Sequence, residues 1–178
     1  MRRAVDLVVS SVALVVLAPG LLIMALVLRI RSGRPVLFLQ DRSGLDGRVF
    51  RIVKFRTMRA PEFPGEPDAA RLGALGWALR VTSLDELPQL WNVLRGEMSL
   101  IGPRPAPPRE VDGYDVWHRR RLSMKPGISG LWQVEARLDE HFDERATLDL
   151  NYIDQWSLAL DFKILVRTIP AVLARPGR

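Results

Sequence analysis

The sequence predicts an α+β protein that is mostly helical and is attached to a membrane by its N-terminal segment. Three observations predict this class: an uncharged run of 22 residues near the N-terminus, two short apolar stretches around an Asp-Gly turn, and helix-like segments over most of the remainder. The chain has 178 residues, of which 48% are hydrophobic, and it has no cysteine. One domain with an ordinary core is expected, and disulfide scaffolds and thiolate metal sites are excluded.

The uncharged run, Leu7–Leu28, is long enough to cross a bilayer. As one helix it would measure about 33 Å, against a hydrocarbon core of about 30 Å. Three arrangements compete: a cleaved signal peptide, a single span, and a re-entrant helical hairpin that enters and leaves one leaflet. The charge of Asp6 and the absence of an Ala-x-Ala site argue against the signal peptide.

Two features favour the re-entrant hairpin. Basic residues flank both ends of the run, namely Arg2, Arg3, Arg29, Arg31 and Arg34. Such flanks tend to stay in the cytoplasm, and a single span would export one of the two groups. Pro19-Gly20 also interrupts the run, where proline removes a backbone hydrogen bond and bends a helix. The alternative is a straight span that tolerates its proline.

The rest of the chain predicts short elements. Strands are expected over 36–40 and 49–53, joined through the Asp46-Gly47 turn, with residues 54–58 continuing the second strand. We expect helices over 69–79, 87–94, 110–122, 140–156 and 158–173, a strand over 131–134, and a rigid proline-rich loop over 102–108. The last helix is apolar and carries Lys163 and Arg167, with Arg175 just beyond it, which suits either a membrane interface or the core. We therefore divide the chain into a membrane segment, 1–34, and one continuous unit, 35–178.

Positive charge is concentrated in the first third of the chain. Residues 1–59 hold 11 Lys/Arg and 3 Asp/Glu, a net charge of +8, whereas the whole chain carries +6. A basic protein favours anionic partners. No recognisable nucleic-acid module and no P-loop or dinucleotide fingerprint is present. We therefore expect lipid and phosphorylated molecules as partners, and no nucleic acid.

The stretch RVTSLDELPQLWNVLRGEMSLIGPRP (80–105) carries adjacent carboxylates, Asp85 and Glu86, near the start of a helix. A capping box between Ser83 and Glu86 is the structural explanation, although Pro88 suggests that the helix begins later. In either case the positive end of the helix favours ionised carboxylates. An ionised aspartate suits nucleophilic attack on phosphorus and coordination of Mg²⁺.

Three arginines stand out in the predicted loops: Arg80, Arg104 and Arg137. Guanidinium groups fit phosphate oxygens with two parallel hydrogen bonds. For each arginine the alternative is a solvated surface position. Arg104 departs most from that alternative, because prolines on both sides restrict its backbone.

Four stretches carry a resemblance: KFRTM (54–58), TSLDELPQLWNVLRGEMSLIGPRP (82–105), KPGISGLWQV (125–134) and LDLNYIDQWSLALDFKIL (148–165). With them the chain resembles the bacterial sugar transferase family, the small monotopic phosphoglycosyl transferases, from Arg2 to about Leu173. The resemblance implies a re-entrant membrane helix and an interfacial catalytic domain on the cytoplasmic face of the bacterial inner membrane.

The resemblance also implies a reaction. Members transfer a phosphosugar from a UDP-sugar to a polyprenyl phosphate, usually undecaprenyl phosphate, and release UMP as the first membrane step of glycan assembly. Downstream glycosyltransferases would use the product. By the matching SLDEL motif, Asp85 would form a phosphosugar-aspartyl intermediate and bind Mg²⁺. Glu86 would deprotonate the acceptor phosphate or orient the pair, and Arg80, Arg104 and Arg137 would hold phosphates or the nucleotide.

Two positions depart from the family pattern. The membrane break is commonly Ser-Pro and is Ala18-Pro19 here, and the common Gly-Asp-Met-Ser stretch contains Glu97 in place of aspartate. Two other functions remain in competition with the transferase: a non-catalytic membrane adaptor that binds anionic lipid, and a basic nucleic-acid binder.

Overall fold

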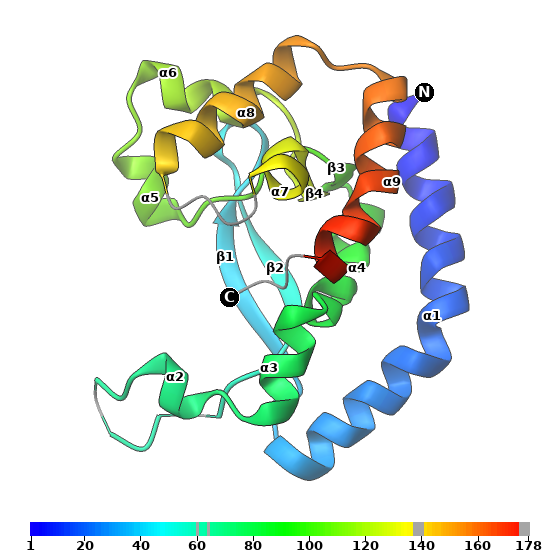
Figure 1. Ribbon diagram of the computed structural model, residues 1–178, viewed down its shortest axis with the longest axis vertical. Coiled ribbons are helices and arrows are strands. Elements are labelled where there is room, and N and C mark those ends of the chain that lie inside the picture. Colours follow the sequence, from blue (N-terminus) through cyan, green and yellow to red (C-terminus); the bar gives the residue numbers. More distant parts are fainter. Residues whose placement is uncertain (60, 64, 137–140, 175–178) are drawn as a thin grey trace.

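The computed structural model describes residues 1–59, 61–63, 65–136 and 141–174 (Figure 1). A long helix, α1 (Arg2–Ser32), forms one edge of the molecule, and the antiparallel strands β1 (Leu37–Ser43) and β2 (Val49–Phe55) run through its centre. Short helices surround the strands, and two longer helices, α8 (Phe142–Asp154) and α9 (Leu158–Ala174), end the described chain. The predicted α+β class, with mostly helical content and one short hairpin, is confirmed.

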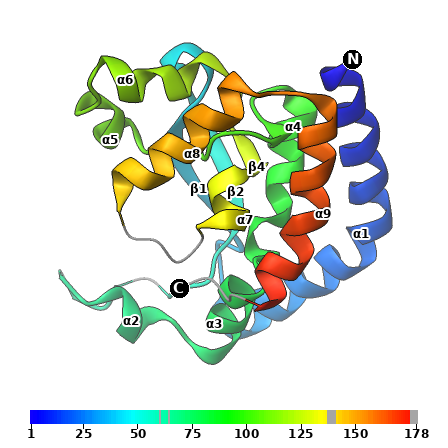
Figure 2. The ribbon, with the colours of Figure 1, turned by 45° about the horizontal axis from the view of Figure 1, so that its top comes forward.

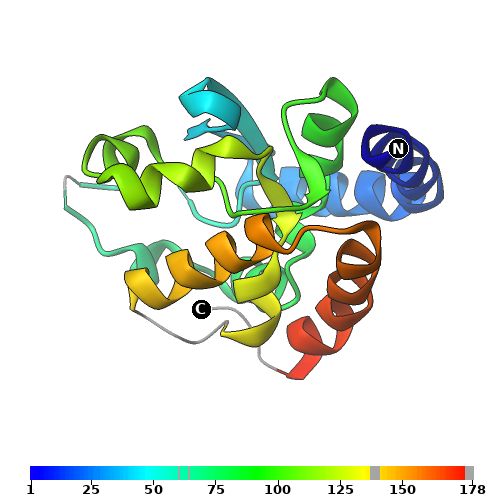
Figure 3. The ribbon, with the colours of Figure 1, turned by 90° about the horizontal axis from the view of Figure 1, so that it is seen from above.

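Helix α1 is continuous and bends near its middle, with Pro19 inside it (Figure 1). Figure 3 shows its N-terminal arm nearly end-on and its C-terminal arm lengthwise, so the two arms point in different directions. The predicted break is therefore a bend in one helix and not a turn between two separate helices, because proline removes only one intrahelical hydrogen bond.

Both arms of α1 rest on the remainder of the protein. The N-terminal arm packs against α4 (Leu90–Arg95) and β3 (Ser99–Ile101). The C-terminal arm buries Leu28 against Phe55 and Leu79. The opposite side of the helix is exposed, and we call it the outer face of α1. It comprises Val8, Val12, Val15, Val16, Leu22, Ile23, Leu26 and Ile30.

The central hairpin follows its predicted pattern. The strands pair from Leu37 opposite Phe55 to Ser43 opposite Val49. The turn between them contains Asp46 and Gly47, with φ of 55° and 76°, as the Asp-Gly signal requires. Strand β1 extends three residues beyond its predicted end, whereas β2 ends at Phe55, three residues before its predicted end. Helix α4 lies against β2.

Helix α4 is tied to the hairpin by one side chain. The Asn92 amide donates to the Arg51 carbonyl at 2.7 Å and accepts from the Val53 amide at 3.0 Å. Glu97 accepts from the same amide group at 2.7 Å. The glutamate that departs from the family pattern therefore braces α4, and it does not line the pocket described below.

A second, parallel pair of strands leads to the pocket. Strand β3 pairs with β4 (Gly127–Ser129), and the sequence did not predict this pair. A Cβ on Gly102 would lie 2.5 Å from the Lys125 carbonyl oxygen, and one on Gly127 would lie 2.1 Å from the Gly102 nitrogen. Glycine is therefore required where the two backbone segments after β3 and before β4 approach each other.

Several predicted elements have different boundaries or a different type. The predicted strand over 131–134 is wrong, because residues Leu131–Glu135 form helix α7. The helix predicted over 69–79 is divided into α2 (Asp68–Arg71) and α3 (Ala74–Val81). The helix predicted over 110–122 is divided into α5 (Pro108–Asp112), α6 (Val116–Arg119) and the 3₁₀ turn η3 (Arg120–Ser123). Figure 2 shows α7 and α8 stacked beside the hairpin.

Candidate active site

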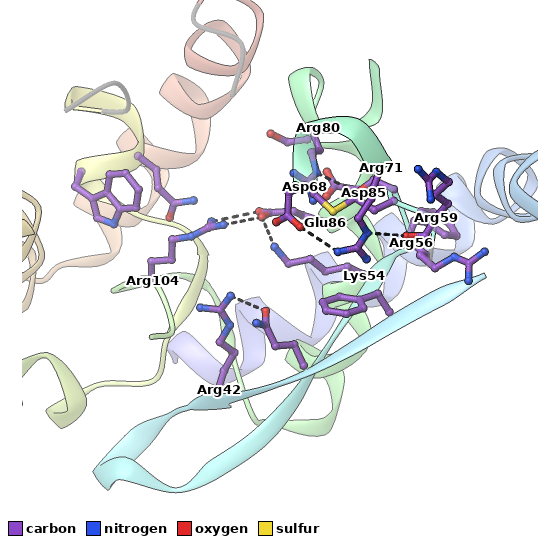
Figure 4. A pocket seen from close by; sticks show the side chains of 18 residues that line it. Arg42, Lys54, Arg56, Arg59, Asp68, Arg71, Arg80, Asp85, Glu86 and Arg104 are labelled. Carbon is purple, nitrogen blue, oxygen red and sulfur yellow. Dashed lines mark hydrogen bonds and ion pairs between the residues drawn. The ribbon is translucent and has the colours of Figure 1, made fainter. Parts of the chain in front are cut away.

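A cavity of about 820 Å³ opens between the hairpin, α3 and the loop that follows β3 (Figure 4). Basic side chains dominate its lining, namely Arg42, Lys54, Arg56, Arg59, Arg71, Arg80 and Arg104. Three carboxylates, those of Asp68, Asp85 and Glu86, share the cavity with them. The excess of positive charge in a concave site favours a polyanionic ligand.

The two adjacent carboxylates lie on a 3₁₀ turn, η2 (Leu84–Gln89), that leads directly into α4. Ser83 precedes the turn in a left-handed conformation, φ 55°, and its side chain makes no capping hydrogen bond. The Glu86 amide donates instead to the Ser83 carbonyl at 3.1 Å. The capping box considered from the sequence is therefore not formed, and both carboxyl groups are available to the pocket.

Glu86 is held between two cations, and we call Lys54, Glu86 and Arg104 the pocket cluster. Lys54 Nζ lies 2.6 Å and Arg104 Nη2 lies 2.8 Å from Glu86 Oε1, as the dashed lines in Figure 4 show. Burial alone would raise the pKa of Glu86, but Arg104 and Lys54 lower it far below its ordinary value. Glu86 is therefore a fixed negative charge.

Asp85 has the opposite environment. It is 8% exposed, and among the described residues no cation lies within ion-pair distance of its carboxylate. Burial raises the pKa of Asp85 to about 6, and the charge of Glu86 adds to the rise. The expectation that a helix N-terminus favours its ionisation is wrong in direction, because a single 3₁₀ turn supplies less positive potential than burial removes.

The structure brings two of the three predicted arginines to the pocket. Arg80, on α3, donates through Nε to Thr57 Oγ1 at 3.0 Å, and Arg104 joins the pocket cluster. Arg137 lies outside the described residues. Pro19 lies in α1 and not in the pocket lining.

Five of the seven basic residues that line the pocket were not singled out from the sequence, namely Arg42, Lys54, Arg56, Arg59 and Arg71. Lys54 lies inside the quoted KFRTM motif, and its β2 position, opposite Phe38, places it in the cavity. Arg42 lies on β1, two residues after Gln40, and donates to the Gln40 side chain at 2.6 Å and to the Pro105 carbonyl at 3.1 Å. The alternation of strand residues was the available signal, since residues two apart share a face.

The residues present fit Mg²⁺ in one specific way. Among the described residues no group of three or more His, Cys, Asp or Glu side chains could enclose a metal ion. Mg²⁺ commonly uses one or two carboxylates together with substrate phosphates. Asp85 offers such a carboxylate, because it is not engaged by a cation, whereas Glu86 is.

Comparison with known proteins decides the family. Residues 1–175 match the family described as bacterial sugar transferase. The chain belongs to the bacterial sugar transferase family. It is 40% identical over 197 residues to the exopolysaccharide production protein ExoY of Rhizobium meliloti, with 99% of this chain and 87% of that protein covered.

Two further relatives have names that describe a reaction. The UDP-glucose:undecaprenyl-phosphate glucose-1-phosphate transferase of Caulobacter vibrioides is 40% identical over 187 residues, covering 97% of this chain and 69% of that protein. The galactosyl transferase CpsE of Streptococcus agalactiae serotype III is 40% identical over 195 residues. This chain spans 43% of the length of CpsE. The family assignment makes this protein a sugar-phosphate transferase, as the sequence motifs indicated.

In this sugar transferase a second buried group of side chains lies behind the pocket, and we call Tyr114, Arg121 and Asp149 the scaffold cluster. Arg121 donates through Nε and Nη2 to Asp149 Oδ2 at 3.0 and 2.8 Å, and it also donates to the Tyr114 hydroxyl at 2.5 Å. Its Nη2 lies 3.4 Å from the Arg104 carbonyl oxygen. The scaffold cluster therefore supports the backbone of the residue that pairs with Glu86.

Proposed function

We propose that this sugar transferase moves a phosphosugar from a UDP-sugar to undecaprenyl phosphate through a covalent phosphosugar-aspartyl intermediate on Asp85, releasing UMP. The observation that carries the proposal is the carboxylate of Asp85, which no described cation engages, inside a strongly basic pocket. The name of the Caulobacter vibrioides relative supports the donor and acceptor classes. The alternative, a non-catalytic membrane adaptor, gives no reason for a buried carboxylate, that of Asp85, beside the ion pairs of Glu86.

In the first step Asp85 is the nucleophile. A carboxylate oxygen forms a bond to the β-phosphorus of the UDP-sugar, and the bond from that phosphorus to the oxygen that bridges the two phosphates breaks. The electron pair leaves with UMP. Arg80 and Arg104, which line the cavity on either side of η2, bind the phosphate oxygens and neutralise their charge. Arg137 would join them on the family pattern.

In the second step a phosphate oxygen of undecaprenyl phosphate attacks the same phosphorus, and the bond to Asp85 breaks. The carboxylate is regenerated and a polyprenyl diphosphosugar leaves. A phosphate monoester has a second pKa of about 6, so most of the acceptor is already a dianion at neutral pH. Glu86, whose pKa is lowered by Arg104 and Lys54, is a poor base. Its role here is to orient Lys54 and Arg104.

Mg²⁺ would be held by Asp85 together with the phosphates of the donor, as the oxygen chemistry of this cation favours. When bound, it would supply additional positive charge against the diphosphate. The chain's own contribution is the placement of that carboxylate at the surface of the cavity.

The membrane arrangement follows from the contacts of α1. Both ends of this helix rest on one body, and the outer face of α1 between them is apolar and exposed. A straight span would place the ends on opposite sides of the bilayer. We therefore propose that residues 1–34 enter and leave one leaflet at the bend around Pro19. The basic flanks support a position of residues 35–178 on the cytoplasmic face of the inner membrane.

Helix α9 contributes a second apolar surface to the proposed interface. It buries Ile164 in the core and exposes Phe162, Val166 and Ile169. Such a helix suits the boundary between lipid headgroups and acyl chains. A lipid-anchored phosphate and a soluble nucleotide would then meet at the pocket.

The test is the covalent intermediate. Purified protein is mixed with Mg²⁺ and a panel of UDP-sugars without acceptor, and intact mass and released UMP are measured. We expect one phosphosugar per chain, about one equivalent of UMP, and discharge on addition of undecaprenyl phosphate. Asp85→Asn should form no adduct, and Asp68→Asn, at a carboxylate that lines the same pocket, should retain it. UMP release by Asp85→Asn would contradict the assigned nucleophile, and lipid binding without any turnover would favour the adaptor.

A further inference from the structure

The N-terminal segment of α1, residues 2–10, is more polar than an anchoring segment requires. A helix that only enters lipid needs an apolar surface. In α1, however, Asp6 is 6% exposed and Ser10 is fully buried. A buried carboxylate is strongly unfavourable unless hydrogen bonds satisfy it. The hydrogen-bond partners of Asp6 therefore indicate which part of the protein this segment supports.

All the described partners of Asp6 come from strand β3. Ser99 Oγ lies 3.0 Å from Oδ1 and 2.8 Å from Oδ2, and the Leu100 amide donates to Oδ1 at 3.1 Å. Arg2, in the same segment of α1, donates to the carbonyl of Ile101. Each of the three residues of β3 is therefore hydrogen-bonded to residues 2–10 of α1.

The same segment of α1 also contacts the C-terminal end of α4. Arg3 donates to the carbonyl of Val93 and, at 2.8 Å, to that of Leu94. The last carbonyls of a helix have no partner within it, and a cation there is favourable. Helix α4 directly follows η2, which carries Asp85 and Glu86. Residues 2–10 of α1 are therefore hydrogen-bonded to α4, the helix that follows Asp85 and Glu86.

These two attachments converge on one ion pair. Strand β3 continues through Gly102 and Pro103 to Arg104, whose guanidinium meets Glu86 at 2.8 Å. We propose that Asp6 is a positioning residue: through β3 it fixes the loop that brings Arg104 to Glu86, and so links the seat of the membrane helix to the geometry of the pocket. The inference rests on the proposed function for its kinetic consequences only.

The bond pattern sets the size of the effect. A carboxylate accepts from both Ser99 and the Leu100 amide, whereas the amide of asparagine has one accepting oxygen and would turn its NH₂ group toward a donor. A displacement of about 1 Å at a catalytic group can lower turnover about 100-fold. Loss of one bond at the start of β3 is a milder change, so we expect about a tenfold fall in kcat.

The experiment uses the full chain in lipid nanodiscs, with a UDP-sugar accepted by the wild type and undecaprenyl phosphate. Asp6→Asn should lower kcat about tenfold and leave KM for the UDP-sugar within about twofold, because every side chain that lines the pocket is retained. Asp41→Asn is the matched control, since that carboxylate is exposed and lies 3.5 Å from Arg51. It should keep kcat within about twofold. An Asp6→Asn variant with unchanged kcat would overturn the proposal.

Hydrogen exchange tests the same link without substrate. In Asp6→Asn, backbone amides over 99–104 should exchange about tenfold faster, with no change over 37–55 in the hairpin. Equal acceleration over both segments would mean general destabilisation and would overturn the positioning role. If Asp6→Asn does not fold, Ser99→Ala removes the hydroxyl that donates to the Asp6 carboxylate and should show the same local change. A wild type without turnover would count against the proposed function, and exchange alone would then decide this inference.

Discussion

The pocket cluster and the scaffold cluster both pair cations with a carboxylate, and Arg104 belongs to the surroundings of each. Its guanidinium pairs with Glu86, and its carbonyl accepts from Arg121. The scaffold cluster is closed, since the Arg121 and Asp149 side chains are 7% and 0% exposed. The pocket cluster borders a large cavity and lies beside Asp85, which no described cation engages.

The difference concerns what each cluster does with its charge. In the scaffold cluster one cation meets one carboxylate, because Arg121 donates two hydrogen bonds to Asp149 Oδ2, and the two charges offset each other. In the pocket cluster two cations share one carboxylate, which leaves net positive charge facing the cavity. A buried ion pair that is balanced serves the fold, whereas an unbalanced one beside a cavity favours an anionic ligand.

The largest expected effect is the loss of stability when the scaffold cluster is broken. Arg121→Met leaves Asp149 buried without its cation, which should destabilise the protein by about 3–5 kcal/mol. Arg120→Met is a matched control at the next residue, because its ion pair with Asp154 is half exposed, and it should change stability by less than about 1 kcal/mol. Chemical unfolding in one detergent measures both. Equal losses for the two variants would remove the contrast between the clusters.

The pocket cluster should respond in activity instead. Glu86→Gln frees Lys54 and Arg104 from their shared carboxylate, and misplacement of these cations should lower kcat about 100-fold. Water in the cavity can solvate them, so stability should change by about 1 kcal/mol or less. Glu135→Gln, at an exposed pair with Arg167, is the control for both measurements. A stability loss as large as that of Arg121→Met would show that this cluster is also structural.

The contrast between the clusters also shows what the sequence could predict. The long apolar N-terminal helix, the hairpin, and the adjacent carboxylates with Arg80 and Arg104 follow from local signals: charge, alternation, turn residues and motif spacing. The scaffold cluster does not. Arg121 and Asp149 are 28 positions apart, and no motif in the sequence links them. Their pairing depends on tertiary packing, which no local pattern records.

The sequence also did not predict the different chemical environments of Asp85 and Glu86. The sequence placed Asp85 and Glu86 together and gave them the same expected ionisation. Their pKa values move in opposite directions. Arg104 and Lys54 lower the pKa of Glu86, whereas burial and the neighbouring negative charge raise the pKa of Asp85. The predicted strand over 131–134 failed for a different reason: a stretch of four residues with three apolar side chains fits a short helix as well as a strand.

The pH dependence should report Asp85. Its carboxylate must be ionised to attack phosphorus, and its pKa is raised to about 6, mainly by burial. Activity should therefore be half-maximal near pH 6 and fall about tenfold per unit below that value. In Glu86→Gln the neighbouring negative charge is absent, so the acid limb should move to lower pH. The rate of adduct formation over pH 4.5–8 measures both limbs, and an unchanged limb in Glu86→Gln would contradict the assignment.

The smallest expected effect is a gain of stability in Asp85→Asn. The pKa of Asp85 is higher in the folded protein than the ordinary value of 3.8, so the folded state binds more protons than the unfolded chain between about pH 4 and 6. Stability therefore declines as the pH rises through this window, and the ionised carboxylate destabilises the folded protein at neutral pH. Removing the charge should stabilise the protein by about 1 kcal/mol at pH 7.5 and by almost nothing at pH 4. Unfolding of wild type and Asp85→Asn at both pH values measures the difference, with Asp68→Asn as an exposed control that should show no such gain. A loss of stability at pH 7.5 would mean that Asp85 is held by partners as Asp149 is, and the distinction between the two clusters would no longer explain which acid is free to react.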